Sequence, residues 1–135
     1  MALIVVDASV IVDLLVGDDT PRRKAARERL SSGDAIYAPA HLDIEVISAV
    51  RGIARRNAML ADAAPALIGQ LPRMPIRREV VTEPAAHRIW QLRDNMTAYD
   101  AAYAALAEHL GAALLTYDAE YTAAPGLGCA IELLA

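Results

Sequence analysis

The sequence has few or none of several residue types, including those that form disulfides and those that contribute large aromatic side chains to a core. It contains one cysteine, Cys129, no phenylalanine, one tryptophan and a single lysine, Lys24. A lone cysteine excludes an intrachain disulfide and a zinc site built from several thiolates, and it is typical of proteins in a reducing compartment. We therefore expect a cytoplasmic protein whose core is built from Ala, Leu, Ile and Val.

The chain also lacks a long apolar run. No stretch of about 18 uncharged apolar residues is present, so no membrane-spanning helix is expected. The N-terminus has no basic region, and Asp7 interrupts the first apolar run too early for a signal peptide. The 135 residues suffice for one domain, residues 1–135, with its own core. The hydrophobic fraction of 56% is high and indicates that a partner covers part of the surface.

Negative charge is in slight excess, but the positive charge is clustered. The net charge of −4 argues against a uniformly basic footprint for nucleic acid. The basic residues gather at 22–29, 51–56 and 73–78, and all but Lys24 are arginines, which suit phosphate or carboxylate groups. Each cluster alone fits a solvated helix face. Three clusters together favour RNA or an acidic protein as a partner.

Short β-branched segments alternate with segments of helical periodicity. We expect strands at 2–7, 35–38, 76–81, 113–116 and 129–134, and helices at 9–16, 21–30, 41–56, 60–71, 84–93 and 98–110. Ser9, Thr20 and Thr97 are suitable N-caps, and Gly111 suits the position after a helix end. No hairpin signal is present, so the strands should form a central parallel sheet between helices, a three-layer α/β/α sandwich.

Four carboxylates occupy places where an apolar chain has little structural use for them. Asp7 and Asp118 each follow a buried strand, so both should lie at the carboxyl edge of the sheet, where ligands bind in such folds. Asp100 is in the first turn of a predicted helix. Glu45 lies on the apolar stripe of another helix, beside Leu42, Val46, Ala49 and Ile53, and needs either an arginine partner or a cation.

Each of these acids has an ordinary interpretation as well. Asp7 could cap the following helix, although Ser9 can do so in its place. Asp100 is favourable near a helix N-terminus, and Asp118 could be a turn residue. Thr116 lies on the same side of its strand as Asp118 and could orient a water or a substrate. Taken together, the acids favour a site for a divalent cation, which prefers oxygen ligands.

Other polar residues are expected to stay outside this site. Asp43 should be a solvated acid of the first helical turn, and the histidines His41, His87 and His109 should be surface or cap residues. No histidine or lysine base is therefore apparent, which is compatible with a nucleophile generated at a metal ion.

Three segments resemble the PIN-domain family of ribonucleases, and within it the VapC-type toxins of bacterial toxin–antitoxin pairs. They are VVDASVIVDLL, LDIEVISAV and TAYDAAYAALAEHLGAALLTYDAEY, and the last is the most specific. The likeness spans nearly the whole chain and implies a PIN-like α/β/α fold with an acidic pocket for Mg²⁺, which Mn²⁺ can replace. The family's acidic positions correspond to Asp7, Glu45, Asp100 and Asp118. Thr116 and, less directly, Ser9 correspond to supporting hydroxyl groups.

The resemblance also implies an activity and partners. It implies a Mg²⁺-dependent endoribonuclease toxin that cleaves RNA by in-line attack of water, is inhibited by a small cognate antitoxin and forms a homodimer. Glu120 is a poor match to a further acid found in many members, so the sequence is compatible with one metal ion or two. The alternative is a catalytically degenerate PIN fold that binds RNA or protein. A phosphoacceptor receiver domain is disfavoured because Lys24 lies in a basic helix rather than near the acids.

Overall fold

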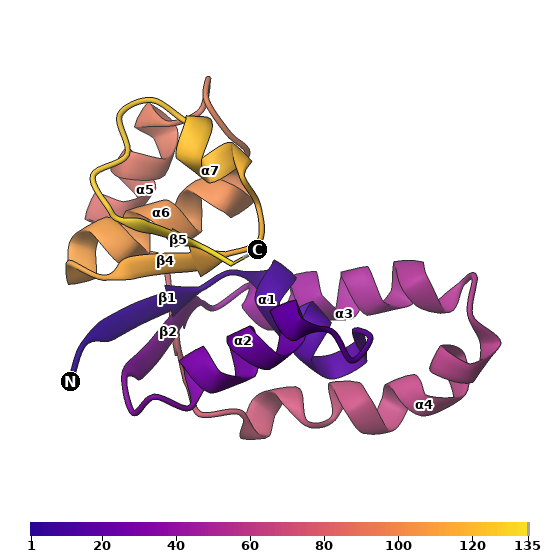
Figure 1. The fold of residues 1–135 in the computed structure, drawn as a ribbon. Helices are drawn as coiled ribbons and strands as arrows, with labels where there is room; N and C mark the ends of the chain where they lie inside the picture. The colour runs from indigo at the N-terminus through magenta and orange to yellow at the C-terminus, as the bar shows by residue number, and fades with distance from the viewer. Residues whose placement is uncertain (135) are drawn as a thin grey trace.

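The computed structural model describes residues 1–134 and contains a five-stranded parallel sheet with helices on both faces (Figure 1). The strands are β1 (Leu3–Val6), β2 (Ala35–Pro39), β3 (Ile76–Glu79), β4 (Ala113–Thr116) and β5 (Ile131–Leu133). Their order is β3-β2-β1-β4-β5, and every neighbouring pair is parallel. The prediction of a three-layer α/β/α sandwich is confirmed.

The helices agree with the predicted segments, with ends displaced by a few residues. They are α1 (Ala8–Val16), α2 (Pro21–Leu30), α3 (Leu42–Ala54), α4 (Ala58–Ile68), α5 (Glu83–Gln91), α6 (Ala98–Leu110) and α7 (Glu120–Ala123), with a 3₁₀ turn at Leu71–Arg73. Helix α7 was not predicted because one turn of helix carries no recognisable periodicity. Helices α3 and α4 extend together beyond the sheet as an arm, whereas α5, α6 and α7 form a block at its other side (Figure 1). No helix within residues 1–134 has the length and apolar content needed to cross a membrane.

The core is centred on β1 and β4, the middle strands of the sheet. Val5, Val6, Leu114 and Leu115 are fully buried. Helix α6 packs on these strands through small side chains, because Ala101, Ala104 and Ala107 of α6 are fully buried as well. Small side chains let a helix lie close to a sheet at the packing density of a protein interior. This close approach fixes the position of the first turn of α6 relative to the ends of the strands.

Helix ends show where local signals decide the structure and where they do not. The Thr97 side chain accepts a hydrogen bond from the first turn of α6, and Gly111 ends that helix with a φ of 62°, as predicted. The prediction that Ser9 caps α1 is wrong. The helix begins at Ala8, so Asp7 takes the N-cap position, yet its side chain makes no capping hydrogen bond. Ser9 lies inside the first turn and its hydroxyl group is turned towards Asp7.

The buried face of α3 is narrower than the predicted apolar stripe. Its buried residues are Leu42, Val46 and Val50. Ala49 and Ile53, which were assigned to the same stripe, are exposed, Ile53 to 43%. The second half of α3 belongs to the arm that projects beyond the sheet (Figure 1), so the sheet cannot cover these side chains.

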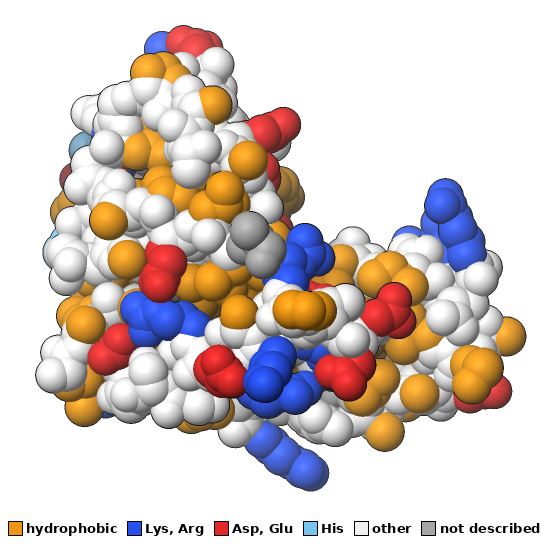
Figure 2. Space-filling model, in the orientation of Figure 1, with side chains coloured by type: hydrophobic (Ala, Val, Ile, Leu, Met, Phe, Trp, Pro, Cys, Tyr) orange, Lys and Arg blue, Asp and Glu red, His pale blue; other side chains and the backbone are white. Residues whose placement is uncertain are grey.

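Several arginines of the predicted basic clusters are engaged in the structure. Arg78 contacts both carboxylate oxygens of Asp43, at 3.2 and 3.0 Å, and three backbone carbonyl groups. The prediction that Asp43 is only solvated is therefore wrong: it holds α3 to β3. Arg29 pairs with Asp34 and Glu132. On the face shown in Figure 2, the basic side chains form separate groups between acidic and apolar ones rather than one continuous surface.

Candidate metal centre

The carboxyl edge of the sheet brings the predicted acids into one region. Strands β1 and β4 are neighbours, and Val6 pairs with Leu115. The residue after each strand therefore lies at the same edge, and the Asp7 amide donates to the Leu115 carbonyl at 2.9 Å. The first turn of α3, with Glu45, comes shortly after β2 ends at this edge. Helix α6 leads back to the start of β4, so its first turn also belongs to this edge.

Asp7 is the buried centre of the region. The residue is 6% exposed, and its Oδ2 atom accepts hydrogen bonds from Ser9 Oγ at 2.7 Å and from Thr116 Oγ1 at 2.9 Å. Burial raises the pKa of Asp7, the two hydroxyl donors lower it, and the negative charge of Asp100 raises it again, with a net increase. Thr116, which is fully buried, thus contacts Asp7 directly, and its supporting role in catalysis stays a prediction.

Glu45 lies half-buried at the start of α3. Its Oε1 atom accepts a hydrogen bond from the Tyr103 hydroxyl at 3.0 Å. Burial is the main reason that the pKa of Glu45 is raised; the bond from Tyr103 and the neighbouring His41 lower it, and the charges of Asp7 and Asp100 raise it. The arginine partner considered for Glu45 is not among its contacts within residues 1–134.

His41 is a site neighbour that the sequence interpretation missed. Its Nε2 atom is buried and lies 2.7 Å from Glu45 Oε1, within ion-pair distance but without the alignment of a hydrogen bond. Its ring packs edge-to-face against Tyr103 and Tyr99, with centroid distances of 5.2 and 5.7 Å. His41 occupies the N-cap position of α3, as a predicted cap residue, but its side chain makes no capping hydrogen bond and contacts the site instead. A signal was available, since His41 precedes Glu45 by four residues, one helical turn.

Asp118 lies in the turn between β4 and α7. Its amide donates to Thr116 Oγ1 at 3.0 Å, and its Oδ1 atom accepts from the Glu120 amide at 2.9 Å. The turn interpretation is thus correct, and it does not exclude a ligand role. Asp118 also lines a cavity of about 140 Å³ together with Asp100 and Glu120. Thr116 therefore links the two acids that follow the central strands, Asp7 and Asp118.

Asp100 lies near Asp118 and also influences Asp7 and Glu45. It lines the cavity with Asp118, and its charge raises the pKa of both Asp7 and Glu45. The pKa of the Tyr121 hydroxyl is raised as well, first by burial and then by the charges of Asp7 and Asp100. In the part of the chain that the structure describes, no three His, Cys, Asp or Glu side chains stand as a ready metal-ligand group. The acids share one region, and several of their oxygens are engaged by protein donors.

The chemistry of these side chains suits a hard divalent cation. All four carboxylates offer oxygen atoms, which Mg²⁺ and Mn²⁺ prefer over nitrogen or sulfur. Mutual repulsion among acids raises their pKa, and a cation between them relieves that repulsion. In this structure burial is the first cause of the raised pKa of Asp7 and Glu45, and the charge of Asp100 adds to it in both groups.

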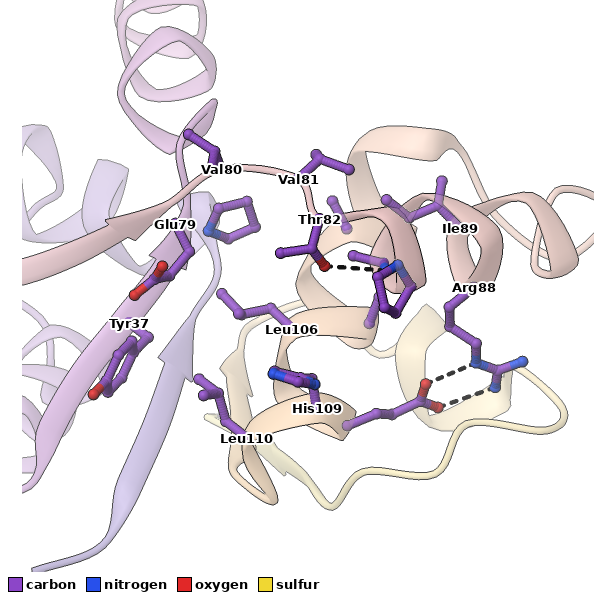
Figure 3. A pocket seen from close by; sticks show the side chains of 16 residues that line it. Tyr37, Glu79, Val80, Val81, Thr82, Arg88, Ile89, Leu106, His109 and Leu110 are labelled. Carbon is purple, nitrogen blue, oxygen red and sulfur yellow. Dashed lines mark hydrogen bonds and ion pairs between the residues drawn. The ribbon is translucent and has the colours of Figure 1, made fainter.

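A larger cavity lies elsewhere, between the sheet edge and helices α5 and α6. It has a volume of about 600 Å³, and Figure 3 shows the apolar side chains of Val80, Ile89, Leu106 and Leu110 around it. None of the four acids lines it. Arg88 of α5 and Glu108 of α6, which also line this cavity, form an ion pair with each other through two hydrogen bonds of 2.7 and 3.0 Å (Figure 3). Its size alone does not make it the functional site.

Comparisons with known proteins identify the family of the chain. The PIN domain family matches residues 4–127. Ribonuclease VapC12 of Mycobacterium tuberculosis is 38% identical over 133 residues, covering 98% of this chain and 100% of that protein. Ribonuclease VapC1 of the same organism is also 38% identical over 133 residues, covering 96% of each chain.

Solved structures with this fold include toxin–antitoxin proteins. VapBC2 from Rickettsia felis, in a crystal structure with a promoter DNA fragment, has a TM-score of 0.69 at 11% identity, covering 98% of this chain and 99% of that one. VapC20 of Mycobacterium tuberculosis, a toxin that cleaves the sarcin–ricin loop, has a TM-score of 0.66 at 17% identity, covering 93% and 97%. At these identities the likeness supports the fold alone.

Proposed function

Because the chain belongs to the PIN-domain family, we propose that it is a divalent-metal-dependent endoribonuclease, the toxin of a toxin–antitoxin pair. The relatives that are 38% identical over nearly the whole chain are ribonucleases by name. One observation carries the proposal: Asp7, Glu45 and Asp100 come from three separate segments that meet at one edge of the sheet, where burial and then the charge of Asp100 raise the pKa of both Asp7 and Glu45.

Asp7, Glu45, Asp100 and Asp118 are the residues that would hold Mg²⁺ or Mn²⁺. Such an ion, when bound, polarises a phosphodiester and lowers the pKa of a water molecule. The protein's own contribution is positioning. The hydroxyl groups of Ser9 and Thr116 both donate to Oδ2 of Asp7 and so fix the orientation of this carboxylate.

Further contacts involve Glu45 and the residue that precedes Asp118. The Tyr103 hydroxyl holds Glu45 Oε1. The Arg22 guanidinium lies 4.0 Å from the centre of the Tyr117 ring, and Tyr117 directly precedes Asp118. This placement puts a positive charge against the residue that precedes Asp118. We expect Arg22 to contact a phosphate of the RNA.

A small antitoxin is the expected protein partner. Apolar side chains of α3 are exposed, Ile44 to 69% and Ile47 to 37%. An amphipathic antitoxin segment that covers them could also present an arginine to the acids of the neighbouring site. Co-purification with the product of an adjacent gene, with loss of RNA cleavage in the complex, is the expected result. A protein that stays fully active beside that product would contradict this part. We further expect a homodimer, which light scattering of the purified protein measures.

RNA cleavage by the purified protein tests the activity. We expect cleavage with Mg²⁺ or Mn²⁺, none with EDTA, and none by the Asp100→Asn variant under saturating metal. Asp94→Asn is the matched control, because Asp94 is an exposed acid in the loop before α6. Cleavage retained by Asp100→Asn would contradict the proposal. Absence of both cleavage and metal binding in the wild type would favour the alternative, a catalytically degenerate PIN fold that binds RNA or protein.

A further inference from the structure

Three aromatic rings form a row that leads from the core to the surface beside the acids. Tyr103 is fully buried, the His41 side chain is 26% exposed, and Tyr99 is 63% exposed. Each neighbouring pair packs edge-to-face, with interplanar angles of 78° between His41 and Tyr103 and 70° between His41 and Tyr99. Edge-to-face contacts are a favourable geometry for aromatic rings. The outermost ring is therefore supported from one side and open on the rest of its surface.

This row is attached to the candidate metal centre at two points. Its inner and middle rings both contact Glu45 Oε1, the Tyr103 hydroxyl at 3.0 Å and His41 Nε2 at 2.7 Å. At its outer end, Tyr99 directly precedes Asp100 in the first turn of α6. The exposed ring is thus connected to Glu45 through His41 and precedes Asp100 directly in the chain.

Within the described residues, Tyr99 makes no contact that the stability of the fold clearly requires. Within residues 1–134 its hydroxyl group makes no hydrogen bond, and its ring contact is with His41. Large exposed apolar or aromatic side chains beside a polar site are typical of ligand contacts. Proteins that bind single-stranded RNA stack unpaired bases on such rings, and stacking tolerates any base because each has a π-face.

We propose that Tyr99 is a stacking platform for an unpaired RNA base next to the bond that is cut, with His41 as the ring that braces it. This inference rests on the proposed function and adds a positioning residue to it. A stacked base would fix the register of the strand so that the adjoining phosphate lies over the acids. The platform also requires an unpaired nucleotide at that position, because a base inside a duplex cannot reach the ring.

Steady-state kinetics on an RNA that the wild type cleaves provide the main test. For Tyr99→Ala and Tyr99→Leu we expect KM to rise about tenfold, the effect of losing one base–aromatic stack. Leucine keeps apolar bulk against His41 but has no π-face, so it separates stacking from simple packing. Tyr99→Phe should stay within about twofold of the wild type. Trp90→Ala is the control, because Trp90 is exposed to a similar degree, 67%, but lies on helix α5 with Arg93 over its ring, outside the row of three aromatic rings.

A binding measurement keeps the test independent of catalysis. A short single-stranded RNA that carries 2-aminopurine loses fluorescence when that base stacks on an aromatic ring. In the cleavage-deficient Asp118→Asn background, we expect quenching with Tyr99 or Phe at this position and none with Ala or Leu. An unchanged KM and unchanged quenching in Tyr99→Ala would overturn the inference while leaving the ribonuclease activity intact. Loss of antitoxin binding with unchanged KM would overturn it too, since the ring would then belong to a protein interface. A wild type that does not cleave RNA would overturn the proposed function, whereas quenching would still decide the role of Tyr99.

Discussion

Replacing Asp7 with asparagine separates the functional use of the buried carboxylate from its effect on stability. Burial and the charge of Asp100 raise the pKa of Asp7, so its ionised form is less stable in the folded protein than in the unfolded chain. Asparagine keeps the shape of the side chain. Its one carbonyl oxygen can accept both hydrogen bonds that Ser9 and Thr116 now donate to Oδ2.

The size of the effect follows from two opposing changes. The two hydrogen bonds become bonds to a neutral acceptor, which removes about 1 kcal/mol each. The penalty for burying an ion, several kcal/mol in proteins, disappears at the same time. Because the net pKa of Asp7 is raised, the second change is the larger. We expect a gain of about 1–2 kcal/mol in the free energy of unfolding at pH 7 without metal, or about 3–6 °C in Tm for a chain of this length.

The pH dependence of stability independently tests whether Asp7→Asn stabilises or destabilises the fold. Between the ordinary pKa of the unfolded carboxyl group, 3.8, and its raised pKa in the fold, the folded protein binds more protons than the unfolded chain. The stability of the wild type therefore rises as pH falls through this window. The advantage of Asp7→Asn is complete above the folded pKa and vanishes below the unfolded one.

Thermal unfolding followed by circular dichroism in EDTA measures this advantage from pH 7 downwards. Asp18→Asn, a substitution of an exposed acid in the turn between α1 and α2, should leave Tm unchanged. A lower Tm of Asp7→Asn at pH 7, or a gain that is the same at every pH, would refute the reasoning. The variant should at the same time lose RNA cleavage, so that stability and activity change in opposite directions.

Three further predictions concern the buried hydroxyl group of Thr116, the ion pair of Arg78 and the raised pKa of the acids. Thr116→Val, which preserves shape but removes a buried hydroxyl group, should lower the free energy of unfolding by about 1–3 kcal/mol in denaturant titrations and reduce cleavage. Arg78→Ala should lower it by about 2–4 kcal/mol, because a partly buried carboxylate and three carbonyl groups lose their donor, whereas Arg51→Ala at an exposed site should change it little. The affinity for Mn²⁺ should begin to fall at a pH above 4.5, the ordinary pKa of glutamate, because burial raises the pKa of Glu45 and of Asp7 in the metal-free protein and protons then compete with the cation; an affinity that falls only below that pH would contradict the raised pKa of both groups.

The sequence predicted those parts of the fold whose signals are local. Helix α6 agrees at both ends, because a threonine that caps the helix and a glycine in the left-handed region act on neighbouring backbone groups. Strand ends were sufficient to place Asp7 and Asp118 at one edge, since the carboxyl ends of parallel strands share that edge.

Residues whose roles depend on distant partners could not be assigned in the same way. Asp43 pairs with Arg78, thirty-five positions along the chain, so no local pattern reveals the pair. His41 reaches Glu45 through helical spacing, but its aromatic neighbours come from α6. The cap of α1 was assigned to Ser9 by composition, whereas the end of β1 and the burial of Asp7 decide where that helix begins.

Metal binding by single-residue variants tests the central claim most directly, that Asp7, Glu45, Asp100 and Asp118 together form one cation site. Isothermal titration with Mn²⁺ should give a saturable site in the wild type. Each of Asp7→Asn, Glu45→Gln, Asp100→Asn and Asp118→Asn should weaken it at least tenfold, and Asp94→Asn should leave it unchanged. Affinities that are equal in all five variants and the wild type would contradict the account.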